Sequence, residues 1–105
     1  MIGNVTIGNT EVGMNATASS PIRYRKIFGR DFFVESVREN PDPYLYVEMG
    51  YVMHRMYDNT IAQASYDDYV EWLDSFEPVD ALDAVSDIAA LWSASRKTMT
   101  QPKKK

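Results

Sequence analysis

This 105-residue chain contains no cysteine and no long apolar run. Without cysteine it can form neither a disulfide framework nor a thiolate metal site, and the absence fits a reducing cytosol. No apolar segment approaches the roughly 18 residues that a membrane-spanning helix needs. The N-terminus also lacks a basic segment followed by an apolar one. We therefore expect neither a secretory signal nor a membrane partner.

Sequence signatures of catalysis and cofactor binding are missing as well. The glycines do not form a GxxxxGK[ST] or GxGxxG pattern, which excludes these phosphate-binding loops. His54 is the single histidine, and a lone histidine on a helix rich in methionine and tyrosine is more often a surface or core-edge residue than a catalytic base. No pattern places a nucleophile and an orienting acid beside it. We expect no catalytic residue, no cofactor and no metal, and therefore no enzyme.

Bases are absent from residues 67–87, which carry many acids. The eight acids are Asp67, Asp68, Glu71, Asp74, Glu77, Asp80, Asp83 and Asp87. Their three- and four-residue spacing is helical and the segment has no glycine, whereas calcium loops place oxygens at alternating positions around a glycine bend. A solvated helical face, or an acidic docking face, is the better interpretation. Because most of the chain is acidic, binding to nucleic-acid phosphates is not expected as the main task.

The length and composition fit one small domain with a modest core. We predict a mainly α protein in three parts, with an N-terminal β-hairpin or arm over 1–20, a helical domain over 21–97 and a disordered basic tail over 98–105. In the first part, apolar residues alternate with polar or small ones on both sides of Gly8-Asn9. Such alternation around this pair predicts a β-hairpin.

About five short helices should follow the hairpin. Ser20-Pro21 is a capping residue with proline at the first helical position, and Gly29 fits the residue that ends this helix after Phe28. Asp31 can cap a second helix that runs through about Arg38. The first helix has four residues available for burial, Ile22, Tyr24, Ile27 and Phe28. The second presents on one side Phe33, Val34 and Val37.

The third helix is predicted from about Pro43 to Tyr57. Its apolar stripe at helical spacing consists of Leu45, Met49, Val52, Met53 and Met56. Gly50 in the middle of this helix costs about 1 kcal/mol relative to alanine, which indicates the close approach of a neighbouring helix.

Two further helices are predicted in the last third of the chain. Ser65 with Asp68 is a variant of the capping box and should begin a helix over 66–76. This helix is expected to bury Tyr69, Leu73 and Phe76. The last helix should run over about 79–96, with Leu82, Val85, Ile88, Ala89 and Trp92 on one face. Acids mark the opposite face of that helix.

Four bases of the chain lie among aromatic residues and form a basic cluster of Arg23, Arg25, Lys26 and Arg30. Such interleaving occurs in nucleic-acid binders, but four bases in an acidic chain are weak support for that function. Pairing within the molecule with the acidic face is at least as plausible. The cluster could equally be half of a contact between two copies, basic edge to acidic edge.

Several segments together resemble a known protein family. They are Pro21–Arg25, Phe28–Asp31, Trp72–Glu77, Leu91-Trp92 and the Lys103–Lys105 ending. Their order and spacing are similar to those of the tail assembly chaperones of long-tailed phages and prophages of Gram-positive bacteria. In that family a strand pair leads into a P-x-x-Y-R-x-x-F-G-x-D segment, and a W-L-D-x-F segment follows.

The resemblance implies a non-enzymatic late protein of the host bacterial cytoplasm that is not expected in the mature virion. Members of the family bind the tape measure protein and keep it soluble while the tail tube protein assembles around it. Many of their genes also yield a longer product by translational frameshifting near the end of the short form. Association between copies of the chain is a further expectation.

A structural head–tail connector, or another virion component, is the alternative to a chaperone. A small regulatory protein that binds nucleic acid is a more distant one. Six aromatic residues are candidates for the packing or partner surface, namely Tyr24, Phe28, Phe33, Trp72, Phe76 and Trp92. For each of them plain core burial is the simpler role.

Overall fold

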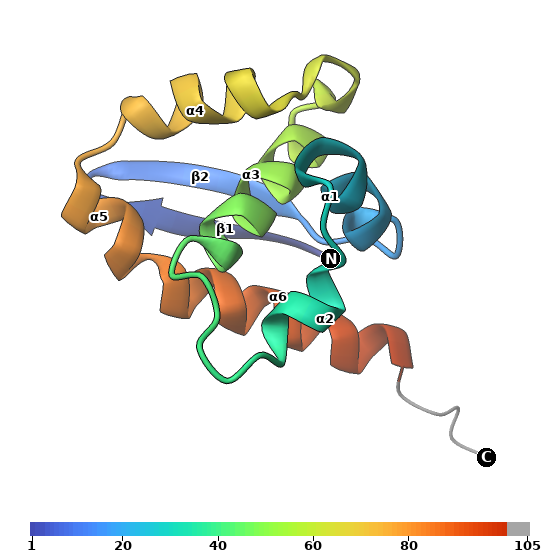
Figure 1. The fold of residues 1–105 in the computed structure, drawn as a ribbon. Helices are drawn as coiled ribbons and strands as arrows, with labels where there is room; N and C mark the ends of the chain where they lie inside the picture. The colour runs from blue at the N-terminus through green and yellow to red at the C-terminus, as the bar shows by residue number, and fades with distance from the viewer. Residues whose placement is uncertain (101–105) are drawn as a thin grey trace.

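The computed structural model describes residues 1–100, and the side chains of residues 1–96. It begins with an antiparallel hairpin of β1 (Ile2–Ile7) and β2 (Thr10–Asn15), and helices follow (Figure 1). They are α1 (Ser20–Phe28), α2 (Phe32–Ser36), α3 (Leu45–Tyr57), the short 3-10 helix η1 (Ile61–Gln63), α4 (Tyr66–Asp74), α5 (Pro78–Asp83) and α6 (Val85–Thr100). The prediction of a mainly α domain that begins with a β-hairpin is confirmed.

The hairpin turns at Gly8-Asn9 and pairs Val5 with Val12 directly across the two strands. Alternate side chains of a strand point to opposite faces, and one face of this hairpin is buried against the helices. The buried residues of that face are Val5, Ile7, Val12 and Met14. The predicted strands are therefore confirmed, and the apolar positions of the alternation form the face that enters the core.

The core is centred on α3, which contacts β2, α1 and α6 (Figure 1). Four members of the predicted stripe are buried, namely Leu45, Met49, Val52 and Met53, whereas Met56 is half-buried. A Cβ on Gly50 would lie 3.0 Å from Cδ1 of Ile88 and 3.2 Å from Cε of Met14. The close approach expected from this glycine is therefore confirmed.

α1 ends where the sequence predicted, and Gly29 follows it with a left-handed φ of 73°. The predicted cap at Ser20 is wrong, because Ser20 is the first residue of the helix and its hydroxyl accepts the Thr17 N–H at 3.0 Å instead. α2 is shorter than predicted, because it ends at Ser36 rather than near Arg38. Asp31 caps α2 as expected, since its Oδ1 accepts hydrogen bonds from the backbone N–H groups of Phe33 (2.9 Å) and Val34 (3.2 Å).

α3 begins at Leu45, two residues later than predicted, because Asp42 Oδ1 accepts the Tyr44 N–H at 2.8 Å and forms a turn there. The cap of α4 is confirmed, since Ser65 Oγ accepts the Asp68 N–H at 3.0 Å. α4 itself ends at Asp74 rather than at residue 76.

The single long helix predicted over 79–96 is wrong, because Ala84 separates α5 from α6. The break lets α5 contact β1 while α6 runs along α3 and β1. α6 continues through Thr100, three residues past our domain boundary at residue 97. The rest of the predicted basic tail, 101–105, lies outside the described residues. None of the helices in residues 1–100 combines the length and the apolar character that crossing a membrane requires.

Candidate interaction surface

The six aromatic candidates fall into three groups by exposure. Tyr24 and Trp92 are buried, and Phe28, Trp72 and Phe76 are half-buried. Phe33 alone is largely exposed, at 44%. Ring contacts link Tyr24 with Phe28 at 4.8 Å and Trp72 with Phe76 at 5.1 Å between centroids. The structure therefore gives packing roles to five of the candidates and leaves Phe33 as the most exposed of the six.

The exposure of Phe33 follows from its neighbour Phe32, which occupies the core instead. The Phe32 ring lies edge-on to Tyr24 at 5.4 Å and to Trp92 at 5.7 Å between centroids. Because adjacent residues of a helix point about 100° apart, burying Phe32 turns Phe33 outward. Phe33 rests against Trp92 at 6.4 Å, and the Arg96 guanidinium lies 5.3 Å from the centre of its ring.

Several large apolar side chains are exposed in this part of the molecule. Eleven large apolar side chains of the described residues are exposed, and four of them lie between residues 22 and 37. They are Ile22 at 72%, Phe33 at 44%, Val34 at 51% and Val37 at 81%. We call these four side chains the α1–α2 surface. The expectation that Ile22 is available for burial is wrong, because Tyr24 turns α1 inward and places Ile22 on its outer side.

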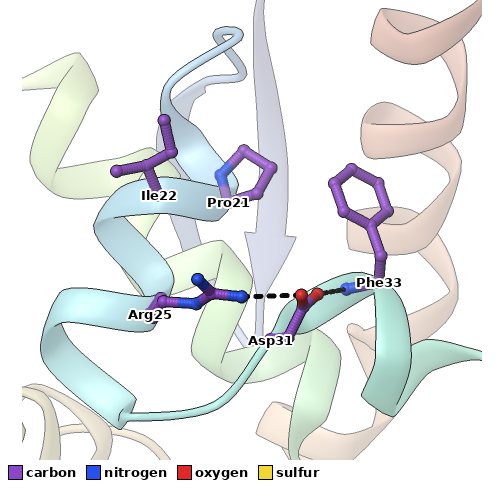
Figure 2. Close-up of a pocket in the computed structure, with 5 residues that line it drawn as sticks. All are labelled: Pro21, Ile22, Arg25, Asp31 and Phe33. Carbon is purple, nitrogen blue, oxygen red and sulfur yellow. Dashed lines mark hydrogen bonds and ion pairs between the residues drawn. The ribbon is translucent and has the colours of Figure 1, made fainter.

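A notch of about 220 Å³ lies within this region. It is lined by Pro21, Ile22, Arg25, Asp31 and Phe33 (Figure 2). Figure 2 shows Pro21 and Ile22 of α1 on one side and Phe33 of α2 on the other, with an ion pair below them. The apolar side chains therefore face a common hollow and can enclose one side chain of a partner.

The ion pair at the base of the notch joins Arg25 Nη2 to Asp31 Oδ2 at 2.7 Å. The other oxygen of the same carboxylate caps α2 through the Phe33 and Val34 N–H groups. Both side chains of the pair are exposed by more than a third, so the pair itself contributes at most about 1 kcal/mol of stability. Its effect is mainly geometric, because it fixes α1 against the start of α2.

The predicted basic cluster does not act as one unit. Arg30 turns inward and binds Glu48 at 2.5 Å, and Arg25 binds Asp31. Arg23 Nε donates to the Ser19 hydroxyl at 3.1 Å, and Lys26 is exposed. Within residues 1–96, none of these four bases pairs with an acid of the 67–87 stretch, so the suggestion of pairing with the acidic face is wrong.

A buried polar group formed by Tyr24, Arg30 and Glu48 was missed from the sequence. The Tyr24 hydroxyl donates to Glu48 Oε1 at 2.6 Å, which joins α1 to α3. Burial raises the pKa of Glu48, although the Tyr24 hydrogen bond and the Arg30 charge act in the opposite direction. Glu48 lies three residues after Leu45 and so interrupts the apolar stripe of α3. That position was the signal that could have revealed a buried acid.

A similar but more exposed group joins α4 to α3. The Tyr51 hydroxyl donates to Asp68 Oδ2 at 2.5 Å, and Arg55 binds the same oxygen at 2.9 Å. Burial raises the pKa of Tyr51, and the hydrogen bond to Asp68 raises it further. Of the predicted acidic face, Asp68 is therefore structural rather than solvated.

His54 is held in a structural position. Its Nδ1 lies 2.8 Å from the Gly13 carbonyl oxygen, and its Nε2 lies 3.6 Å from Asp58 Oδ2. Its ring stacks on Trp72 with the centroids 6.0 Å apart. These contacts tie α3 to β2 and to α4. Within the described residues, the acidic and histidine side chains form no group of three or more that could hold a metal ion.

The geometry thus includes a packed aromatic interior and an apolar surface with a notch, at α1 and α2. Comparison with protein-family models, with curated protein sequences and with solved structures gives no match to this chain. The α1–α2 surface and the sequence resemblance are therefore the two features that bear on function.

Proposed function

We propose that this chain is a non-enzymatic phage tail assembly chaperone. In this proposal it binds the tape measure protein and keeps it soluble while the tail tube protein assembles around it. It acts in the host bacterial cytoplasm and is absent from the mature virion. The observation that carries the proposal is the α1–α2 surface, where four large apolar side chains are exposed and two of them, Ile22 and Phe33, line a preformed notch. The resemblance in sequence supplies the identity of the client.

The energetics of this surface favour a reversible contact. Burying an apolar side chain completely is worth roughly 1.5–3 kcal/mol, and association itself costs roughly 4–15 kcal/mol. Four partly exposed side chains therefore offset that cost without a large excess. An assembly factor that must leave its client needs such a balance, whereas a permanent structural subunit is expected to bury a larger and more apolar interface.

Charge also supports the proposal. The chain carries a formal net charge of −4, and most acids of the 67–87 stretch are exposed. A complex that includes such a negatively charged protein is repelled by other copies of itself. A long apolar client would therefore stay dispersed while it is bound.

The test is co-expression of the full chain with the tape measure protein, with the soluble fraction of the client as the measurement. Wild-type chain should raise that fraction. The double variant Ile22→Ser/Phe33→Ser should lose most of the effect. The control Val79→Ser/Leu82→Ser removes exposed apolar side chains from α5 instead and should retain the effect.

Two results would overturn the proposal. One is a client whose solubility is unchanged by the wild-type chain. The other is an equal loss of client solubility with the α5 control and with the α1–α2 variant, provided that circular dichroism shows that both variants fold. Mass spectrometry of purified particles tests the remaining part, since a chaperone is expected to be absent from them and a virion component present.

A further inference from the structure

A second concave site lies on the other flank of α1. It is a groove of about 380 Å³ between α1 and η1, which we call the α1–η1 groove. Its lining is Arg23, Lys26, Ile27, Ile61, Ala62 and Ala64. Tyr24 is buried between this flank and the one that carries Pro21 and Arg25, so the groove shares no lining residue with the notch.

The charged side chains of the groove are both basic and are not neutralised. Arg23 makes its hydrogen bond to the Ser19 hydroxyl, and Lys26 has no hydrogen-bond or ion-pair partner among the described residues. Arg25 and Arg30, on the same segment, each bind a carboxylate. In a chain with a net negative charge, this concave site therefore holds a local excess of positive charge. Charge of one sign in a cleft with apolar walls attracts ligands of the opposite sign.

The rest of the lining is aliphatic and is held in place. Ile27, Ile61 and Ala64 pack against the core, and Ala62 is exposed. The turn of η1 is fixed by the hydrogen bond from Ala64 N–H to the Ile61 carbonyl at 3.1 Å. The groove therefore offers an apolar floor with a basic edge. A ligand that matches it needs an aliphatic part and a carboxylate close together.

We propose that the α1–η1 groove binds a segment of a partner protein that presents an aliphatic side chain next to one or more carboxylates. The aliphatic side chain lies on the floor formed by the two isoleucines, and the carboxylates approach Arg23 and Lys26. This proposal is independent of the α1–α2 surface and of the chaperone function, since it uses different residues and a different chemistry of recognition.

A nucleic acid fits the groove less well than such a segment. Its lining contains no aromatic ring on which a base could stack. A small free carboxylate fits less well too, because it would leave the aliphatic floor exposed to water. Only a ligand with both features uses the whole site.

The experiment uses the full chain and three fluorescent eight-residue peptides, each with two central leucines. The flanking residues are glutamate in the first peptide, glutamine in the second and lysine in the third. Fluorescence anisotropy should show that the glutamate peptide binds more tightly than the glutamine peptide, by about two- to thirtyfold, as two exposed ion pairs would give. The lysine peptide should bind most weakly, and added salt should reduce the difference.

Two variants with the same change of charge locate the binding. Lys26→Glu reverses the unpartnered base of the groove and should remove the preference for the glutamate peptide. Arg38→Glu reverses an exposed base outside the groove and should preserve it. Ala62→Asp, which adds a negative charge to the groove wall, should also weaken the binding of the glutamate peptide.

Several outcomes would overturn the proposal. They are equal binding of the glutamate and glutamine peptides, equal effects of Lys26→Glu and Arg38→Glu, and absence of binding by the glutamate peptide at millimolar concentration. A single-stranded oligonucleotide that displaces the glutamate peptide at lower concentration than unlabelled peptide does would identify a phosphate site instead. None of these results bears on the co-expression test of the α1–α2 surface.

Discussion

α3 and α2 are in contact and are both rich in apolar side chains, yet the fold uses them differently. α3 is surrounded by β2, α1 and α6, and eight of its thirteen residues are buried. In α2 only Phe32 is buried, while Phe33 and Val34 remain exposed. The core is thus completed without most of the apolar residues of α2. Apolar side chains that the fold does not need are those available for binding a partner.

The largest expected effect concerns stability and would sharpen this contrast. Met53→Ala in α3 empties part of a fully buried site and should lower the free energy of unfolding by about 2–5 kcal/mol. Val37→Ala, just after α2, removes an exposed side chain and should change the free energy of unfolding by less than about 0.5 kcal/mol. Urea unfolding of both variants measures the difference. Similar losses would mean that the region after α2 belongs to the core after all.

A second prediction compares the two polar groups that attach helices to α3. Tyr24→Phe removes the hydroxyl that donates to buried Glu48, and should cost about 1–3 kcal/mol. Tyr51→Phe removes the hydroxyl that donates to Asp68, a carboxylate that is 30% exposed and can bind water instead. That variant should cost about 0.5–1.5 kcal/mol. The reverse order in thermal unfolding would contradict the difference in burial.

A third prediction separates the cap of α2 from its ion pair. Asp31→Ala removes both, and should cost about 1 kcal/mol, mainly through the cap. Asp31→Asn keeps an oxygen for the Phe33 N–H but loses the charge that holds Arg25, so it should cost less. Denaturant unfolding measures the stability of both variants, and an Asn variant as unstable as the Ala variant would assign the larger effect to the ion pair.

The smallest effect is the pH dependence due to Glu48. Its pKa is raised in the folded state, mainly by burial, so folding favours the protonated carboxyl. Its stabilising contribution is therefore complete below the unfolded pKa of about 4.3 and is lost as pH rises through the folded pKa. Glu48→Gln does not titrate, so its stability relative to wild type should increase from about pH 4 to pH 7. If the unfolding midpoints of wild type and of Glu48→Gln change in parallel with pH, Glu48 makes no such contribution.

The fold could be predicted from the sequence wherever a few neighbouring residues carry the information. The turn at Gly8-Asn9, the end of α1 at Gly29 and the cap at Ser65 are of this kind, because each depends on the local backbone. Gly50 was also informative, since a glycine inside a helix needs a reason to be there.

The rest depended on contacts between distant parts of the chain. Phe32 and Phe33 are chemically identical neighbours, and only the positions of Tyr24 and Trp92 decide which of them is buried. Arg30 looked like one of four surface bases because its partner, Glu48, lies eighteen residues further along. The break at Ala84 follows from the position of β1, almost eighty residues before it in sequence. The candidate site was therefore found only in part, through Phe33.

The carboxylate of Asp31 links two properties that would otherwise vary separately. One of its oxygens begins a helix and the other fixes the neighbouring helix in place. A change of residue at position 31 therefore alters the local backbone and the spacing of the two helices together, whereas a change at position 25 alters the spacing only. In relatives of this chain, position 25 should accept many residue types, while position 31 should be restricted to aspartate and its closest polar substitutes.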